Sequence, residues 1–177
     1  MRNTIQLRSR ILITLLVGIL SIAGETAASA QTTVGGHIGI LVPWVTHAGG
    51  NTTTVFDTFS LGLPFGVSIK GQGRMFVDFE FIPHINEAPH LATLTVDPGV
   101  LWRLNHGFTT GLRATFNVNS SSIGFVPILN KSWKLHDQTG FFKTFFGEID
   151  VPVTFDRPAG GPATNPVTFA TQFGFGF

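Results

Sequence analysis

Residues 167–177, with the sequence VTFATQFGFGF, carry an apolar side chain at nearly every second position up to the last residue. The apolar positions are Val167, Phe169, Phe173, Phe175 and Phe177. Between them lie Thr168, Gln172, Gly174 and Gly176. A repeat of two residues places alternate side chains on opposite faces of an extended chain. The segment therefore predicts a β-strand with one apolar face.

Seven further segments show the same alternation. They span residues 34–45, 57–70, 74–82, 92–104, 108–118, 123–135 and 141–155. Three short connectors, 71–73, 105–107 and 136–140, contain residues that favour tight turns. The connectors on the other side are generally longer, at 46–56, 83–91, 119–122 and 156–166. We therefore expect an all-β fold in which eight antiparallel strands run up and down, as in transmembrane β-barrels.

The few charged residues follow the same alternation. They make up 12% of the chain, about half of the 25% that is usual in soluble domains. Ten of the thirteen charged residues in the eight segments share the polar positions: Lys70, Arg74, Asp78, Glu80, Asp97, Arg103, Arg113, Lys134, Glu148 and Asp150. The other three, Asp57, Lys131 and Lys143, lie near segment ends, where a side chain can reach lipid headgroups. Because an Arg or Lys facing lipid at mid-bilayer costs roughly 2–4 kcal/mol, this pattern predicts a barrel with its apolar face in lipid and its charges in the lumen.

Residues 1–30 have the features of a secretory signal peptide. Arg2, Arg8 and Arg10 precede an apolar run at 11–23, and Ala28-Ser29-Ala30 offers a cleavage site. Cleavage leaves a barrel domain of residues 31–177 with eight basic and nine acidic residues. That domain has no basic stripe, so a nucleic-acid partner is not expected. The chain contains no cysteine, which excludes disulfides and cysteine-based zinc sites.

With these features, residues 31–177 resemble a small bacterial outer-membrane β-barrel of the OmpA/OmpX type. The closing strand, with Phe169, Phe173, Phe175 and Phe177, resembles the C-terminal signal that the outer-membrane insertion machinery reads. The resemblance implies a monomer in the outer membrane of a Gram-negative cell envelope, with membrane lipids and that machinery as partners. Two features depart from the family: tyrosine is absent, and prolines interrupt the segments at Pro43, Pro64, Pro98, Pro127 and Pro152. Each proline removes a backbone donor, so we expect these prolines at bulges or rims.

The alternation also predicts what fills the lumen. A polar network is expected from His37, Asp78, Glu80, Asp97, Arg113, Glu148 and Asp150. A basic cluster is expected at the periplasmic end of the lumen, from Lys70, Arg74, Arg103 and Lys134. The interior of an eight-stranded barrel is filled by its own side chains or holds one small ligand. The main hypothesis is therefore a plugged lumen, and the alternative is a narrow path for a cation, a proton or a small solute.

The function expected from the sequence is that of a small surface protein, which is structural or binds a ligand or partner through its outer loops. The alternative is an enzyme that modifies lipid of the outer leaflet. Its candidate residues would lie near one rim: His47, His84, Glu87, His90 and the serines of 120–122. We assign no catalytic residue, cofactor or metal from the sequence. The spacing His84-x-x-Glu87-x-x-His90 fits zinc only loosely.

Overall fold

The computed structural model describes residues 32–86, 93–118, 120–136, 139–157, 161 and 163–177. The predicted signal peptide, residues 1–30, lies outside them. Within them the chain forms eleven β-strands and one short 3-10 turn, η1 (Asn105–Gly107). The strands are β1 (Thr33–Ala48), β2 (Asn51–Thr54), β3 (Ser60–Gly62), β4 (Phe65–Lys70), β5 (Met75–Asn86), β6 (Thr93–Arg103), β7 (Phe108–Asn117), β8 (Ile123–Lys134), β9 (Thr144–Asp150), β10 (Val153–Phe155) and β11 (Val167–Gly176).

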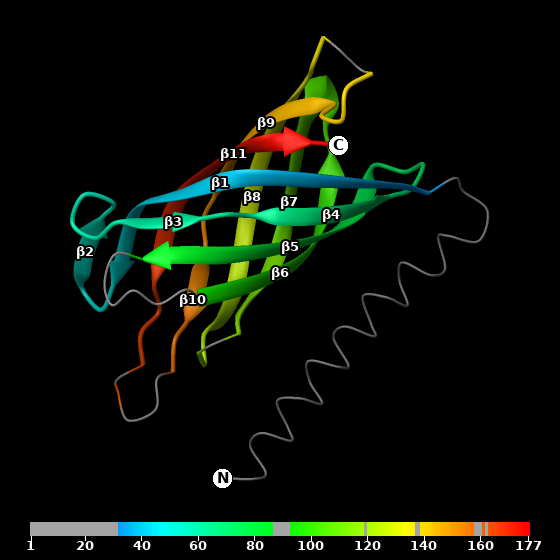
Figure 1. Ribbon diagram of the computed structural model, residues 1–177. Coiled ribbons are helices and arrows are strands. Elements are labelled where there is room, and N and C mark those ends of the chain that lie inside the picture. Colours follow the sequence, from blue (N-terminus) through cyan, green and yellow to red (C-terminus); the bar gives the residue numbers. More distant parts are fainter. Residues whose placement is uncertain (1–31, 87–92, 119, 137–138, 158–160, 162) are drawn as a thin grey trace.

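These strands close into an eight-stranded antiparallel barrel (Figure 1). Strands β3 and β4 together make one barrel strand, as do β9 and β10, and β2 extends β1 as a hairpin. The barrel closes where β1 pairs with β11, from His37 opposite Gly176 to His47 opposite Val167. The predicted fold class, an all-β closed barrel of eight antiparallel strands, is confirmed.

The two ends of the barrel differ in their connectors. We call the end at which β1 begins and β11 ends the short-turn end; its connectors start at Gly71, Leu104 and Leu135. The opposite end, where β1, β5 and β7 finish, is the long-loop end (left in Figure 1). Among the described residues, no helix is long and apolar enough to cross a membrane.

The five prolines lie where backbone pairing is locally interrupted. The register between β1 and β11 shifts between Pro43 and Val45. Pro64 separates β3 from β4, and Pro152 separates β9 from β10. Pro127 lies opposite this second break, where its carbonyl accepts the backbone N–H of Val151 at 3.1 Å. At Pro98, the pairing of β6 with β7 passes from Val96 to Gly99. A missing N–H is tolerated at such positions because the ladder is already broken there.

Two stretches that the sequence analysis assigned to loops are strands. Residues 51–54 pair with the end of β1 through a two-residue turn in which Gly49 and Gly50 both have positive φ, at 57° and 82°. This backbone geometry favours glycine and fits the twist of a hairpin. Strand β5 continues to Asn86, four residues beyond its expected end, because Pro83 pairs with Leu94 without breaking the strand.

The outer wall is apolar and the interior holds the charges. On the outside lie exposed Ile40, Val67, Leu112, Leu129 and Phe173. The buried polar residues are Ser68, Asp78, Glu80, Asp97, Arg113, Thr115, Glu148, Asp150 and Gln172. A smaller group of buried apolar side chains, including Phe76, Leu101, Val126 and Ile128, packs beside them. Charges buried inside an apolar wall are the reverse of the usual soluble arrangement.

Candidate functional site: an ionic network across the lumen

Arg113 lies at the centre of the lumen and binds carboxylates from two other strands. On the β5 side, its Nη2 is 3.0 Å from Asp78 Oδ2, and its Nη1 is 3.1 Å from Glu80 Oε2. On the β9 side, Nη1 is 2.6 Å from Glu148 Oε1. Asp78 and Glu80 are two residues apart, as are Glu148 and Asp150, so each pair projects from one face of its strand. The guanidinium therefore bridges the barrel interior.

A second layer of polar side chains completes the hydrogen bonding of three of these carboxylates. Ser68 donates to Asp78 Oδ1 at 2.6 Å, and Asn130 donates to Glu148 Oε2 at 3.0 Å. Glu80 Oε1 accepts from Gln172 at 2.8 Å and lies 2.9 Å from His37 Nε2. Buried charges are tolerated when they are paired and hydrogen-bonded in this way.

Asp97 and Asp150 are bonded differently from the other three acids. Asp97 hydrogen-bonds to Thr115 through one carboxylate oxygen, but its Oδ1 has no hydrogen-bond partner among the described residues. Neither oxygen of Asp150 accepts a hydrogen bond within the described part of the chain, and the Asp150 side chain lies within hydrogen-bond reach of the Glu148 carboxylate. The nearest cation that the structure shows for Asp150 is Arg113, with Nη1 3.8 Å from Oδ1, beyond hydrogen-bond reach. Both residues are buried.

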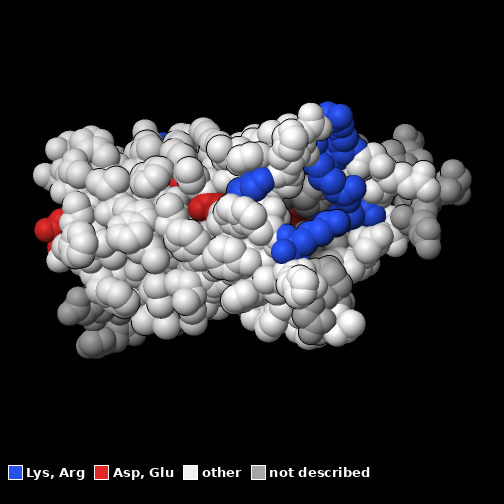
Figure 2. Space-filling view, turned by 90° about the horizontal axis from the view of Figure 1, so that it is seen from above, with Lys and Arg blue, Asp and Glu red and all other residues white. Residues whose placement is uncertain are grey.

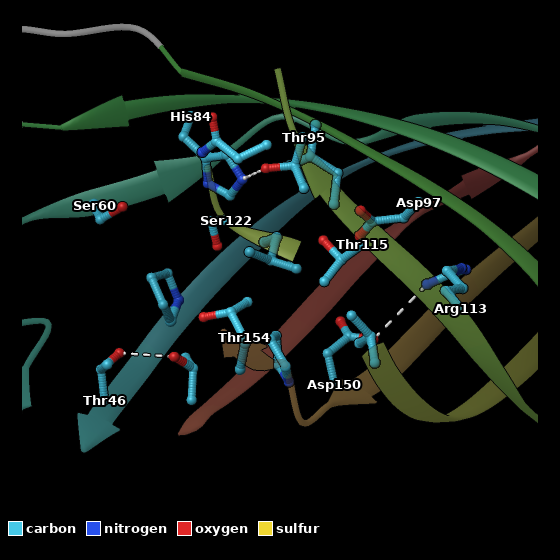
Figure 3. A pocket seen from close by; sticks show the side chains of 18 of the residues that line it. Thr46, Ser60, His84, Thr95, Asp97, Arg113, Thr115, Ser122, Asp150 and Thr154 are labelled. Carbon is cyan, nitrogen blue, oxygen red and sulfur yellow. Dashed lines mark hydrogen bonds and ion pairs between the residues drawn. The ribbon is translucent and has the colours of Figure 1, made fainter. Parts of the chain in front are cut away.

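Arg113 also separates two cavities. On the long-loop side lies a cavity of about 360 Å³, whose lining includes Glu80, Asp97, Arg113 and Asp150. On the short-turn side lies a cavity of about 100 Å³, whose lining includes His37, Asp78, Arg113 and Glu148. Figure 3 shows Asp97, Asp150 and Arg113 at one end of the larger cavity, and Thr46 and Ser60 at the other. The ionic network therefore lies between the two cavities.

The seven residues predicted for the lumen network all lie in it or beside it. His37, Asp78, Glu80, Arg113 and Glu148 are joined by direct contacts, and Asp97 and Asp150 face the larger cavity. Four further residues of this site were not predicted for it: Ser68, Asn130, Thr115 and Gln172. Each of them lies on the polar face of its strand, and this was the signal that could have identified them.

The four residues of the predicted basic cluster lie at the short-turn end. Lys70 lines the smaller cavity, and both Lys70 and Arg103 lie over the ring of Phe76. Arg103 also donates to the carbonyl of Gly73 at 3.3 Å. Arg74 and Lys134 are exposed on the rim. The cluster therefore forms part of the rim at this end, and its member Lys70 also lines the smaller cavity.

The aromatic residues of the closing strand face outward. Phe169, Phe173, Phe175 and Phe177 are each at least 40% exposed. Phe177 stacks on Phe141 with ring centroids 4.5 Å apart, and Phe175 contacts Phe142 and Phe145. This group of rings is an apolar surface at the short-turn end.

Of the residues considered for catalysis or zinc, the structure describes His47, His84 and the serines of 120–122, and Ser122 lines the same cavity as His84. His84 belongs to β5 rather than to a loop and faces the larger cavity, where its Nε2 lies 2.9 Å from Thr95 Oγ1. His47 Nδ1 lies 2.9 Å from Thr52 Oγ1. Glu87 and His90 lie outside the described residues. Within the described ranges, no three His, Cys, Asp or Glu side chains are grouped so that they could hold a metal ion.

Asp57 lies in the loop between β2 and β3 at the long-loop end. The hydroxyl and the backbone N–H of Thr54 both donate to its Oδ2, at 2.8 and 2.7 Å. These two hydrogen bonds lower the pKa of Asp57, which is fully exposed. Its carboxylate is therefore an ionised acidic group outside the lumen.

Fold and site together define the class of protein: a closed eight-stranded antiparallel β-barrel with a network of buried charges across its interior. No protein-family model, no curated protein and no solved structure matches the chain.

Proposed function

We propose that this protein is a small, monomeric integral outer-membrane barrel with a closed polar lumen, which binds a ligand or partner at its long-loop end. The observation that carries the proposal is the division of side chains between the two faces of the wall. Large apolar residues cover the outside, and acidic, basic and other polar side chains are buried inside. The signal peptide expected at residues 1–30 agrees with export to such a membrane.

The outer wall supports contact with lipid. Leu112, at mid-length on β7, is 49% exposed, and its partners across the ladder are Val100 and Pro127. In water, monomeric proteins rarely expose continuous apolar surfaces larger than a few hundred Å². A hydrocarbon solvent removes this penalty, because no water has to be ordered around the wall.

Residues near both rims also support a barrel that spans a bilayer from end to end. Trp102 and Trp133 are exposed near the short-turn end, and Trp44 is exposed nearer the long-loop end. Tryptophans are enriched where membrane meets water. Six basic residues lie at the short-turn end: Lys70, Arg74, Arg103, Lys131, Lys134 and Lys143. Figure 2 shows Lys and Arg gathered towards that end of the visible face, beside a wall that is largely uncharged. We infer that the exposed cations of this group, Arg74 and Lys134, contact lipid phosphates.

The lumen favours a closed barrel over a channel. Arg113 borders both cavities, and its three close carboxylates come from the β5 and β9 walls. An ion passing through would have to break these contacts inside a buried environment, where removing a partner costs about 3–5 kcal/mol. We therefore propose that binding takes place at the long-loop end and that solutes do not pass through.

The test is membrane fractionation of the full-length chain produced in a Gram-negative host. We expect the protein in the outer-membrane fraction after an alkaline wash, and we expect it to require detergent for extraction. On gels, the unheated sample should migrate differently from the boiled sample, because a closed barrel resists detergent until it is heated. A chain that remains soluble without detergent would contradict the proposal.

A further inference from the structure

The larger cavity has a hydroxyl-rich wall and an acidic floor. Its hydroxyl groups include those of Thr46, Ser60, Thr95, Thr115, Ser122 and Thr154 (Figure 3). The floor contains Asp97, Asp150, Glu80 and Arg113. At about 360 Å³, the cavity lies within the range of about 300–1,000 Å³ that is typical of small-molecule sites.

Two carboxylates on this floor are bonded incompletely. Asp97 is 4% exposed and Asp150 is 1% exposed. Three of their four oxygens accept no hydrogen bond from the described side chains and backbone, and the nearest polar group to Asp150 is another acid, Glu148. The guanidinium of Arg113 does not supply the missing bonds, because its close contacts go to Asp78, Glu80 and Glu148. A buried carboxylate without donors is strongly unfavourable, so a ligand that brought donors and positive charge would stabilise this floor.

The chemistry of the floor distinguishes between two kinds of cation. A divalent metal ion of the calcium type needs six to eight oxygen ligands, several of them carboxylates. In the described part of the chain, no group of three acidic or histidine side chains is arranged for a metal. An ammonium group needs only a few acceptors at hydrogen-bond distance. Its alkyl chain would lie against apolar lining residues such as Ile82 and Val126.

We propose that the cavity on the long-loop side of Arg113 binds a small organic cation of the alkylamine class. One ammonium group hydrogen-bonds to Asp97 and Asp150, and the rest of the ligand extends along the threonine and serine wall towards the long-loop end. This inference deepens the proposed function, because it names the ligand class of the binding site and rests on the barrel being closed at Arg113.

The test is calorimetric titration of the barrel, folded in an uncharged detergent, with diaminobutane. The matched probe is butanediol, which has the same chain without the charge, and magnesium chloride tests the metal alternative. We expect heat of binding with diaminobutane alone. Asp150→Asn and Asp97→Asn should each weaken the affinity at least about tenfold, because each change removes a buried charged acceptor. The control is Asp57→Asn, which removes an exposed carboxylate with the same change in charge and should leave the affinity within about twofold.

Thr154→Phe provides a second variant, because it fills the cavity and leaves both acids in place. It should also abolish binding, so the inference stays testable if an aspartate variant does not fold. Equal responses to diaminobutane and butanediol, equal or tighter binding of magnesium, or undiminished binding by Asp150→Asn or Thr154→Phe would each overturn the inference. The heat-dependent gel shift of the same samples reports on the barrel separately. A protein that folds in detergent but ignores the amine contradicts the ligand assignment and leaves the membrane proposal intact.

Discussion

Arg113 Nη1 and Glu148 Oε1 are 2.6 Å apart in the middle of the barrel, and both side chains are almost completely buried. Arg113 belongs to β7 and Glu148 to β9, with β8 between them. The ion pair therefore spans the curved interior and does not join neighbouring strands. Because Asp78 and Glu80 bind the same guanidinium from β5, Arg113 connects three separate parts of the wall.

Removing the guanidinium should destabilise the barrel strongly. Arg113→Met leaves Asp78, Glu80 and Glu148 without their shared cation, so we expect a loss of about 3–5 kcal/mol in the free energy of unfolding. Urea titration in lipid vesicles measures this loss. The control is Arg157→Met in the long-loop region, where the side chain donates to exposed loop oxygens; we expect a change within about 0.5 kcal/mol. Equal stability of the two variants would show that the network does not stabilise the barrel.

The wild-type barrel should be electrically silent. The network at Arg113 separates the two cavities, so we expect no stepwise current when the folded protein is inserted into a planar bilayer. Asp78→Asn with Glu80→Gln tests the network further, because it removes two charges and keeps the shapes of the side chains. We expect this double variant to fold less stably, as judged by its heat-dependent gel shift. Reproducible current steps from the wild-type protein would favour the channel alternative.

The alternation of residues was sufficient to predict the barrel, and it placed on one face the six charged residues that are buried in the described part of the chain: Asp78, Glu80, Asp97, Arg113, Glu148 and Asp150. Arg113, Glu148 and Asp78 could be assigned to the lumen because a two-residue period fixes the face of every side chain on a regular strand. The alternation could not predict which acid pairs with Arg113. That depends on the heights of the strands relative to one another, and the strand breaks at Pro64 and Pro152 and the shift at Pro43 alter those heights.

Two further features could not be predicted from the sequence, because they depend on the structure around single residues. His84 was expected in the loop 83–91, yet β5 passes through Pro83 and brings His84 into the larger cavity. The incomplete bonding of Asp97 and Asp150 results from the positions of side chains on neighbouring strands, and no residue pattern along one strand contains that information.

The line where the barrel closes should not tolerate a side chain at Gly174. A Cβ atom there would clash with the carbonyl oxygen of Ile38 and would lie 2.8 Å from the Cα of Gly39. These are backbone atoms of β1, so β11 would have to move away from its partner. We expect Gly174→Ala to destabilise the folded barrel by about 1–3 kcal/mol in the same urea titration.

The control for Gly174 is Gly71→Ala in a turn at the short-turn end. A Cβ atom at Gly71 has no heavy atom within 4 Å other than those of its neighbours in the chain. We expect a change within about 0.5 kcal/mol for this variant. If Gly174→Ala were as stable as Gly71→Ala, the close packing of β1 against β11 would not be important for closure.

The central claim is that the outer wall faces lipid, and Leu112→Arg tests it most directly. Leu112 is exposed at mid-length on β7, whereas Met75 is exposed at the first residue of β5, on the rim. The measurement is the free energy of unfolding in lipid vesicles for Leu112→Arg and for Met75→Arg. A membrane-spanning wall predicts a loss of about 2–4 kcal/mol at Leu112 and about 0–1 kcal/mol at Met75. Equal and negligible losses at both positions would contradict a wall that faces lipid.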